Sequence, residues 1–251
     1  MTNWRSMLPL LFIAGLSAGF VDAVAGGGGL ITLPALLWAG LPVQSALGTN
    51  KMQSSCGTLL AVIRYARAGL VTWNEVRLAV AITFVFAVLG TWAVTLLSAG
   101  VLKMIVPWLL LTVAVYALLS PRLGLERATA RLSATAFAWL GGISLGFYDG
   151  FFGPGTGSFW TIALLTLRGM ELTRATAFTK VVNLASNLAA LMVFLAAGTV
   201  NGRIALVMIV GQLIGARLGS GMVIKHGTRF VRIVFLIVVF ALTAKLLWDQ
   251  L

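Results

Sequence analysis

The amino-acid sequence predicts an all-α polytopic membrane protein made of two inverted structural repeats, each holding a glycine-broken re-entrant helical hairpin and three transmembrane helices. Of its 251 residues, 60% are hydrophobic and only 10% are charged, and the mean hydropathy is +1.02. Because a soluble domain has about 25% charged residues, this composition assigns the chain to a lipid bilayer. The lengths of the apolar segments and an internal duplication then predict how the helices are organised.

Ten apolar segments follow one another along the chain, at 7–25, 30–40, 45–67, 77–98, 101–119, 132–151, 158–168, 174–197, 203–224 and 230–248. The full-length segments hold about 19 to 24 residues, enough for a helix to cross a hydrocarbon core of about 30 Å. Segments 30–40 and 158–168 reach only about half way across. Each of the two follows a glycine cluster, so each is predicted to be the second arm of a hairpin that enters and leaves on one side of the membrane.

The second half of the sequence repeats the first. A shift of 127 residues aligns the two glycine clusters, and after a two-residue insertion a shift of 129 aligns the later segments. The pairs related in this way include Gly19 and Gly146, Phe20 and Phe147, Asp22 and Asp149, Gly26 and Gly153, Gly28 and Gly155, Lys51 and Lys180, and Gly90 and Gly219. The predicted units are a first repeat at 1–119, a cytoplasmic linker at 120–131 and a second repeat at 132–251, a construction known from many membrane proteins.

The distribution of cations predicts how the repeats are oriented. If each glycine cluster forms a hairpin, one side of the membrane holds Arg64, Arg67, Arg77, Arg122, Arg127, Arg131, Arg168, Arg174, Lys225, Arg229 and Arg232, and the other holds only Arg5, Lys103, Arg203 and Lys245. If the glycines instead kink a single crossing helix, the cations divide nine against six. Since cytoplasmic loops are enriched in Lys and Arg, the hairpin is favoured, with inverted halves and both termini in the periplasm.

The glycine clusters predict a site for an anion. Irregular backbone at membrane depth must be buried in protein or line a cavity, and the start of the short helix that follows presents free N–H groups and a partial positive charge. The candidate binding residues here are Gly27, Gly28 and Gly29 in the first repeat and Gly155, Thr156, Gly157 and Ser158 in the second. An alternative is that the glycines only let two helices approach closely.

Each repeat also places a lysine in an apolar segment, with polar side chains near it. Ionisable residues in a membrane are costly, by about 2.5–3.5 kcal/mol on insertion scales, and are candidates for function. The predicted ligands are Asn50, Lys51 and Gln53 in one repeat and Lys180, Asn183 and Asn187 in the other, with Asp22 and Asp149 in a coupling or structural role. Lys51 is expected to pair with Asp22 or with Asp149, and Lys180 with the other aspartate. Such pairs lock the fold, or release a lysine when an aspartate takes up a proton, and the sequence leaves both roles open.

Composition excludes several other classes of function. The chain has one cysteine, Cys56, and one histidine, His226, so we expect no Cys/His metal site and no cofactor. Lys51 and Ser54 or Ser55 are too close along one helix to form a Ser–Lys catalytic pair, so we expect no enzyme and no catalytic residue. The net charge of +12 comes mostly from cations between apolar segments, which indicates contact with the bilayer and not with nucleic acid.

With these motifs the sequence resembles the TauE/SafE family of membrane proteins, which includes sulfite exporters and organosulfonate permeases. The similarity extends from about residue 10 to residue 248 and rests on 25–29 (AGGGG), Leu33-Pro34, Thr49-Asn50-Lys51 and 146–158 (GFYDGFFGPGTGS). The resemblance implies a secondary transporter of small sulfur-containing or carboxylate anions in the bacterial inner membrane. A passive anion channel, a non-transporting scaffold or assembly subunit, a homo-oligomer and a coupling proton stay open at this point.

Overall fold

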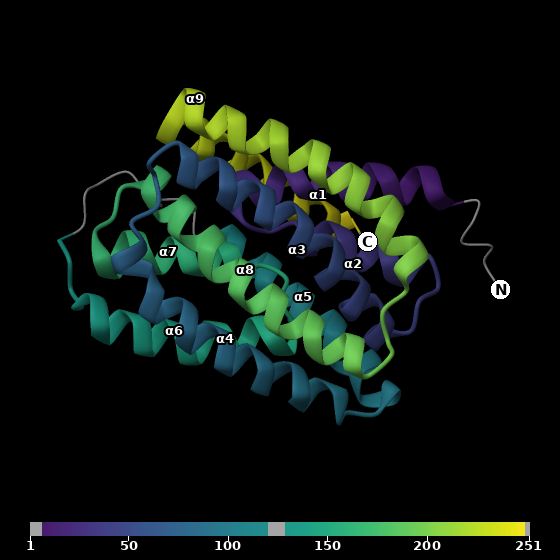
Figure 1. Cartoon of the computed structure of the whole chain (residues 1–251). Coiled ribbons are helices and arrows are strands. Elements are labelled where there is room, and N and C mark those ends of the chain that lie inside the picture. Colours follow the sequence, from purple (N-terminus) through teal and green to yellow (C-terminus); the bar gives the residue numbers. More distant parts are fainter. Residues whose placement is uncertain (1–6, 120–128, 249–251) are drawn as a thin grey trace.

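The computed structural model describes residues 7–119 and 129–248. In this part of the chain all regular structure is helical, with no strand, which confirms the all-α prediction (Figure 1). The predicted linker at 120–131 lies mostly outside the described residues. The helices are α1 (Leu8–Ala25), α2 (Gly29–Trp38), α3 (Val43–Arg67), α4 (Trp73–Thr95), α5 (Ala99–Leu119), α6 (Ala134–Phe151), α7 (Thr156–Arg168), α8 (Leu172–Ala196) and α9 (Gly202–Trp248).

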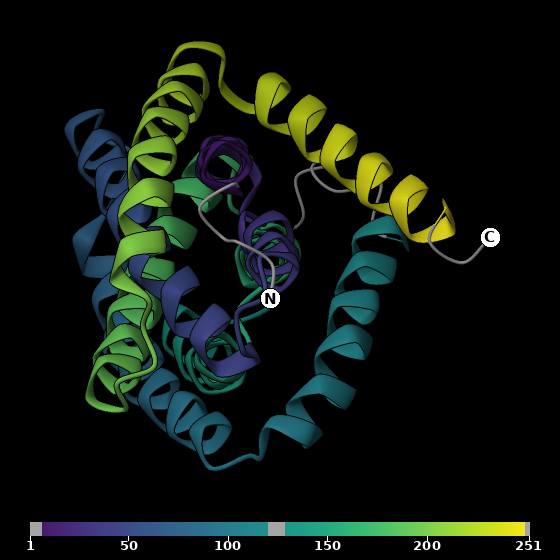
Figure 2. The same ribbon diagram turned by 90° about the vertical axis from the view of Figure 1, so that its right-hand side faces the viewer.

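Four helical stretches in the described part of the chain are long and apolar enough to cross a membrane: α1, α4, α8 and the part of α9 at Gly202–His226. The sequence predicts a break between 203–224 and 230–248, but α9 continues through it as one helix of 47 residues. No proline lies in this region, and a single glycine within a helix costs only about 1 kcal/mol relative to alanine. Figure 2 shows that the ribbon of α9 changes direction instead, and its later part runs near α5.

Each glycine cluster joins two antiparallel helices. Gly26 ends α1 with φ 70°, and its N–H donates to the carbonyl of Asp22 at 3.0 Å. Helix α2, of ten residues and so about 15 Å long, then returns beside α1 (Figure 1). In the second repeat, Gly153 and Gly155 adopt φ 95° and 84° between α6 and α7. Only glycine adopts these conformations without strain, which is why both helices stop here.

The two repeats are intertwined. Helix α9 of the second repeat packs against α1 and α3, and α4 of the first repeat packs against α6 and α8. The same contact occurs twice at related positions: a β-carbon on Gly19 would lie 2.9 Å from Cα of Gln212, and one on Gly146 would lie 2.9 Å from Cα of Thr83. Small residues allow this close approach of helix backbones. Each hairpin is therefore held by a helix from the other repeat.

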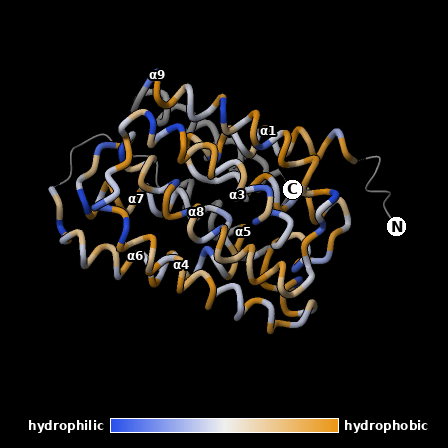
Figure 3. The backbone as a smooth tube through the Cα atoms, in the orientation of Figure 1, coloured by the Kyte–Doolittle hydropathy of each residue, from blue (hydrophilic) through white to orange (hydrophobic). Residues whose placement is uncertain are grey.

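Polarity is distributed inside out. Large apolar side chains face outward. Ile13, Trp92, Leu140 and Leu206 are 56–60% exposed, and Trp139 is 51% exposed. Figure 3 shows hydrophobic residues along the outer helices and hydrophilic ones mainly at the helix ends and in the interior. Such a surface is costly in water and suits a lipid environment, in agreement with the composition.

Cations collect at one end of the helix bundle. Contacts between chain segments define that end: Arg168 donates to the carbonyl of Leu132 at 2.6 Å, and Arg174 lies 3.4 Å from Glu75. The ends of α3 and α7 and the starts of α4, α6 and α8 lie there, whereas α5 and α9 start at the opposite end (Figure 1). The first group of segments carries Arg64, Arg67, Arg77, Arg131, Arg168 and Arg174, and Lys103 and Arg203 follow the starts of α5 and α9. Lys225 comes four residues after Gly221 of α9, where a β-carbon would lie 2.9 Å from Nη2 of Arg64. The predicted cations Arg5, Arg122 and Arg127 lie outside the described residues, as do the side chains of Arg229, Arg232 and Lys245.

Candidate functional site

The tips of the two hairpins touch in the interior of the bundle. A β-carbon on Gly26 would lie 2.7 Å from Cα of Gly157, and one on Gly157 would lie 2.7 Å from Cα of Gly26. Ser158 joins the tips, because its hydroxyl donates to the carbonyl of Gly26 at 2.6 Å and lies 3.2 Å from that of Ala25. Two irregular segments that begin about 130 residues apart in the sequence thus form one contact, with backbone against backbone.

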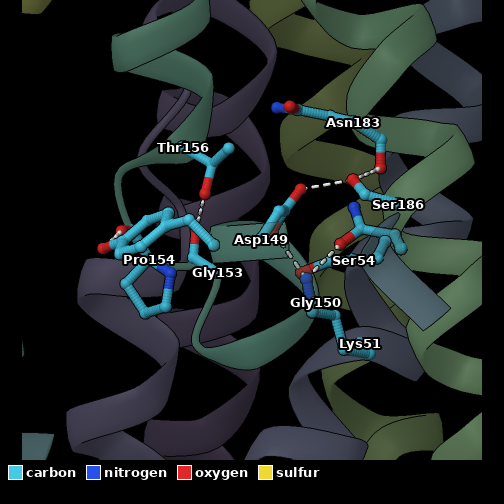
Figure 4. A network of polar contacts seen from close by, with 12 residues as sticks. Lys51, Ser54, Asp149, Gly150, Gly153, Pro154, Thr156, Asn183 and Ser186 are labelled. Carbon is cyan, nitrogen blue, oxygen red and sulfur yellow. Dashed lines mark hydrogen bonds and ion pairs between the residues drawn. The ribbon is translucent and has the colours of Figure 1, made fainter. Parts of the chain in front are cut away.

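A buried ion pair lies beside this contact. Lys51 Nζ on α3 donates to Asp149 Oδ1 on α6 at 2.7 Å and to Asn187 Oδ1 on α8 at 3.1 Å. Ser186 on α8 donates to the other carboxylate oxygen of Asp149 (Figure 4). The side chains of Lys51 and Asp149 are only 2% and 5% exposed. Both oxygens of this carboxylate are therefore satisfied by partners in the protein.

A second ion pair uses the residues related to the first by the repeat. Lys180 Nζ on α8 lies 3.1 Å from Asp22 Oδ2 on α1, and Thr58 on α3 donates to the same oxygen at 3.4 Å. Lys180 is fully buried, whereas the Asp22 side chain is 17% exposed. The Lys180–Asp22 contact is close enough for an ion pair, but its direction does not make a good hydrogen bond, so Nζ donates none within the described chain. The pairs thus cross between repeats, a choice that the sequence leaves open.

A small cavity of about 30 Å³ lies between the hairpin tips and the two ion pairs. This volume is on the order of one or two water molecules. Most of the predicted binding residues line it, together with both aspartates, Ser54 and Gly153. The lining residues are Asp22, Gly27, Gly28, Gly29, Asn50, Lys51, Ser54, Asp149, Gly153, Gly155, Thr156, Gly157, Asn183 and Asn187.

Three predicted binding residues lie outside the cavity lining. Gln53 is fully buried, and its amide nitrogen donates to Asn50 Oδ1 at 2.9 Å and to Ser54 Oγ at 3.0 Å. Ser158 uses its hydroxyl to join the hairpin tips. Lys180 is covered by Asp22, which lines the cavity while its lysine partner does not. These three side chains position their neighbours in this conformation.

The two hairpins present different backbone groups to the cavity. In the described chain the N–H groups of Gly27, Gly28 and Gly29 donate no hydrogen bond, because they lie at the start of α2. In the second hairpin the N–H of Thr156 donates to Gly153 at 3.1 Å, whereas those of Gly155 and Gly157 donate none. Free amides at a helix N-terminus attract negative charge, and the first hairpin has three of them at the cavity where the second has two.

Sequence reasoning missed several polar contacts around the site. Ser186 holds Asp149, and Thr32 donates to Asn50 at 2.5 Å. The hydroxyls of Thr161 and Thr179, at positions related to Thr32 and Asn50 by the shift of 129, lie 3.1 Å apart. A search for polar pairs at corresponding positions in both repeats could have found this second set of contacts. In the described residues no group of three His, Cys, Asp or Glu side chains could hold a metal ion.

Comparison with known proteins identifies a family and several relatives. Residues 11–246 match the model of the family described as Sulfite exporter TauE/SafE. The chain is 42% identical over 244 residues to the probable membrane transporter protein YfcA of Escherichia coli K12, covering 97% of this chain and 91% of that protein.

Proteins of other organisms are also similar to the chain. A probable membrane transporter protein of Haemophilus influenzae is also 42% identical, covering 97% of this chain and 96% of its own length. The probable membrane transporter protein MJ0441 of Methanocaldococcus jannaschii is 26% identical, with 90% of each chain covered. No solved structure matches the chain.

Proposed function

Because the chain belongs to the Sulfite exporter TauE/SafE family of membrane transporters, we propose that it is a secondary transporter of small anions that works by alternating access in the bacterial inner membrane. Its substrates are sulfite, organosulfonates or related sulfur-containing or carboxylate anions. The observation that carries the proposal is the polar cavity, lined by a buried lysine and by free backbone amides, inside an otherwise apolar helix bundle. Membership in a family of membrane transporters also indicates that the chain is not an enzyme.

Donors around the cavity suit an oxyanion. An ammonium group has three N–H donors, and Lys51 uses two of them on Asp149 and Asn187, which leaves one for a ligand. The side-chain amides of Asn183 and Asn187 and the N–H groups of Gly27–Gly29 supply further donors. Hydrogen bonds from charged donors to an anion are stronger than neutral ones. The two lysines and two aspartates cancel in charge, so the amides and the helix dipole matter for attraction.

Alternating access requires the site to open. A cavity of about 30 Å³ is smaller than a polyatomic anion with its contacts, so this conformation is a closed one. The packing of the helices defines the two units that move. The first unit consists of α1, α2, α3 and the first part of α9, and the second consists of α4, α6, α7 and α8. Sliding of α3 past α8, where the two units meet, would open the cavity first to one side and then to the other.

The membrane topology that accompanies this mechanism has two re-entrant hairpins that enter from opposite sides, with the cation-rich end in the cytoplasm. Ala68 and Ala197 test it, because they are exposed and related by the shift of 129. They directly follow α3 and α8, whose C-terminal ends lie at opposite ends of the bundle (Figure 1). In a Cys56→Ser background, we expect Ala68→Cys to react with a membrane-impermeant maleimide only from the cytoplasmic side and Ala197→Cys only from the periplasmic side. Labelling of both from one side would contradict inverted repeats.

Anion flux tests the function itself. In liposomes that contain the purified protein, we expect exchange of sulfite, thiosulfate or methanesulfonate to fall at least about tenfold in Lys51→Ala and in Lys180→Ala, because each removes a charge-assisted interaction worth about 1.5–3 kcal/mol. Lys103→Ala, at an exposed lysine far from the cavity, serves as the matched control and keeps full flux. Unchanged exchange in both site variants, with correct folding shown by gel filtration, would defeat the proposal.

A further inference from the structure

The two ion pairs occupy equivalent places in the two repeats, but they are not held equally. Asp149 accepts hydrogen bonds on both carboxylate oxygens, from Lys51 and Ser186. Asp22 accepts only on Oδ2, from Thr58 at 3.4 Å, with Lys180 Nζ close by but poorly directed. Within the described chain, nothing donates to Asp22 Oδ1. Both oxygens of Asp149 therefore accept hydrogen bonds, whereas Oδ1 of Asp22 accepts none within the described chain.

A difference between the repeats explains this. The position related to Ser186 in the first repeat is Gly57, which carries no hydroxyl. A side chain there would require the buried side chain of Gln212 on α9 to shift, because a β-carbon on Gly57 would lie 2.7 Å from Nε2 of Gln212. Asp22 thus lacks the donor that Asp149 receives from Ser186, and the space that a hydroxyl would need is occupied by Gln212.

Asp22 is also the carboxylate that covers a buried charge. It lines the cavity and is 17% exposed, while Lys180 behind it is fully buried and does not reach the cavity. Asp149 is 5% exposed, and its partner Lys51 lines the cavity directly. Movement or neutralisation of Asp22 would therefore add a positive charge to the site, whereas neutralisation of Asp149 would break a saturated internal pair.

This inference rests on the transport function proposed above. We infer that Asp22 is the proton-binding group of the transporter and that protonation of Asp22 releases the positive charge of Lys180 from its ion pair. The Lys51–Asp149 ion pair remains intact throughout. The proton binds at Asp22 Oδ1. Lys51, Lys180, Asp22 and Asp149 together have zero net charge, so one proton gives the site a charge of +1. One monovalent anion restores neutrality, and the anion and the proton move together without net charge transfer.

The charged groups facing Asp22 are few in the described part of the chain. Lys180 comes from α8, and across the cavity lie Lys51 from α3 and Asp149 from α6. The phenol of Tyr65 on α3 donates to the adjacent carbonyl of Ala23 at 2.7 Å. Helices α2, α7 and α9 place no charged side chain in the cavity lining. Protonation of Asp22 therefore leaves the Lys180 charge without a compensating group until an anion binds.

Methanesulfonate is a suitable probe, because its charge does not change near neutral pH. We measure proton uptake with a dye trapped in proteoliposomes under a methanesulfonate gradient, and binding as thermal stabilisation of the full chain in detergent. For the wild type we expect proton uptake with the anion, and an affinity that rises by up to about tenfold for each unit by which pH falls while Asp22 is ionised in the free protein. We expect no dependence of flux on membrane potential.

Asp22→Asn imitates the protonated state, so we expect binding of methanesulfonate at the level that the wild type reaches at low pH, independent of pH and without proton uptake. Asp22→Glu should restore both pH dependence and proton uptake. Ser186→Ala takes one donor from Asp149 without leaving a charge unpaired, and it should keep proton uptake. Proton uptake that survives in Asp22→Asn, or that is lost in a folded Ser186→Ala, would overturn the assignment.

The two proposals fail in different ways. If the wild type neither binds nor moves methanesulfonate, sulfite or thiosulfate, anion transport itself is wrong, and Asp22 has no anion to couple. If the wild type moves methanesulfonate but no proton accompanies it, anion transport stands and the coupling role of Asp22 is wrong.

Discussion

Replacing Lys51 with methionine is expected to destabilise the protein by about 3–5 kcal/mol, because removal of one partner leaves the other charge buried without compensation. That charge is the Asp149 carboxylate, 2.7 Å from Lys51 Nζ and 5% exposed. The double variant Lys51→Met/Asp149→Leu should recover most of the stability, since a well-packed apolar pair can replace a buried ion pair with little net cost. The double variant should still not transport anions, because the cavity loses its lysine.

Unfolding in detergent by heat or denaturant measures these differences. The matched control is Arg174→Met, which breaks the Arg174–Glu75 pair at 3.4 Å, whose side chains are 49% and 45% exposed. Exposed pairs contribute at most about 1 kcal/mol, so this variant should unfold close to the wild type. A double variant no more stable than Lys51→Met, or one that transports anions normally, would show that the Lys51–Asp149 pair has another role.

Gly157→Ala is expected to separate the hairpin tips. Its β-carbon would lie 2.7 Å from Cα of Gly26 and 2.8 Å from Nδ2 of Asn183. Contacts shorter than 3 Å with backbone cannot be relieved by turning a side chain, and overpacking of this kind costs about 1–3 kcal/mol. Since the tips enclose the cavity, we also expect anion flux to fall by at least about tenfold, in line with the strong effect of small displacements on positioned groups.

Gly202→Ala is the matched control for this substitution, because nothing lies within 4 Å of a β-carbon at Gly202. Surface changes of this type usually alter stability by no more than about 0.5 kcal/mol. Thermal unfolding and the liposome flux assay together separate the two variants. Wild-type stability and flux in Gly157→Ala would mean that the tips do not need to touch.

The exchange of α4 and α9 between repeats changes how motion should be described. A carrier whose sequence halves were separate bodies would rock residues 1–119 against 132–251. Here α9 packs on α1 and α4 packs on α6, through glycines that bring backbones into contact. In the proposed transport cycle, each moving unit would therefore be composed of both halves of the sequence, with the cavity where the two units meet.

The sequence alone determined the features that depend on local or one-dimensional information. Apolar segments predicted the helices, and the glycines at 26–29 and 153–157 located the two interruptions, because positive φ and close backbone contact require glycine. The duplication with Asp22 and Asp149, Lys51 and Lys180 identified the ionisable residues that the structure brings together. The bend of α9 escaped prediction, since polar residues at 225–229 indicate a loop and a bent helix equally well.

Only the tertiary structure decided which groups pair and which face the cavity. Lys51 meets a residue 98 positions away and another 136 positions away, so no local pattern could choose Asp149 over Asp22 as its partner. The inequality of the two ion pairs depends on Ser186 in one repeat and on Gly57 beneath Gln212 in the other. Such contacts arise from helix packing between the repeats. A duplication in the sequence shows that the two halves are similar, but it does not show at which residues the packing around the two ion pairs differs.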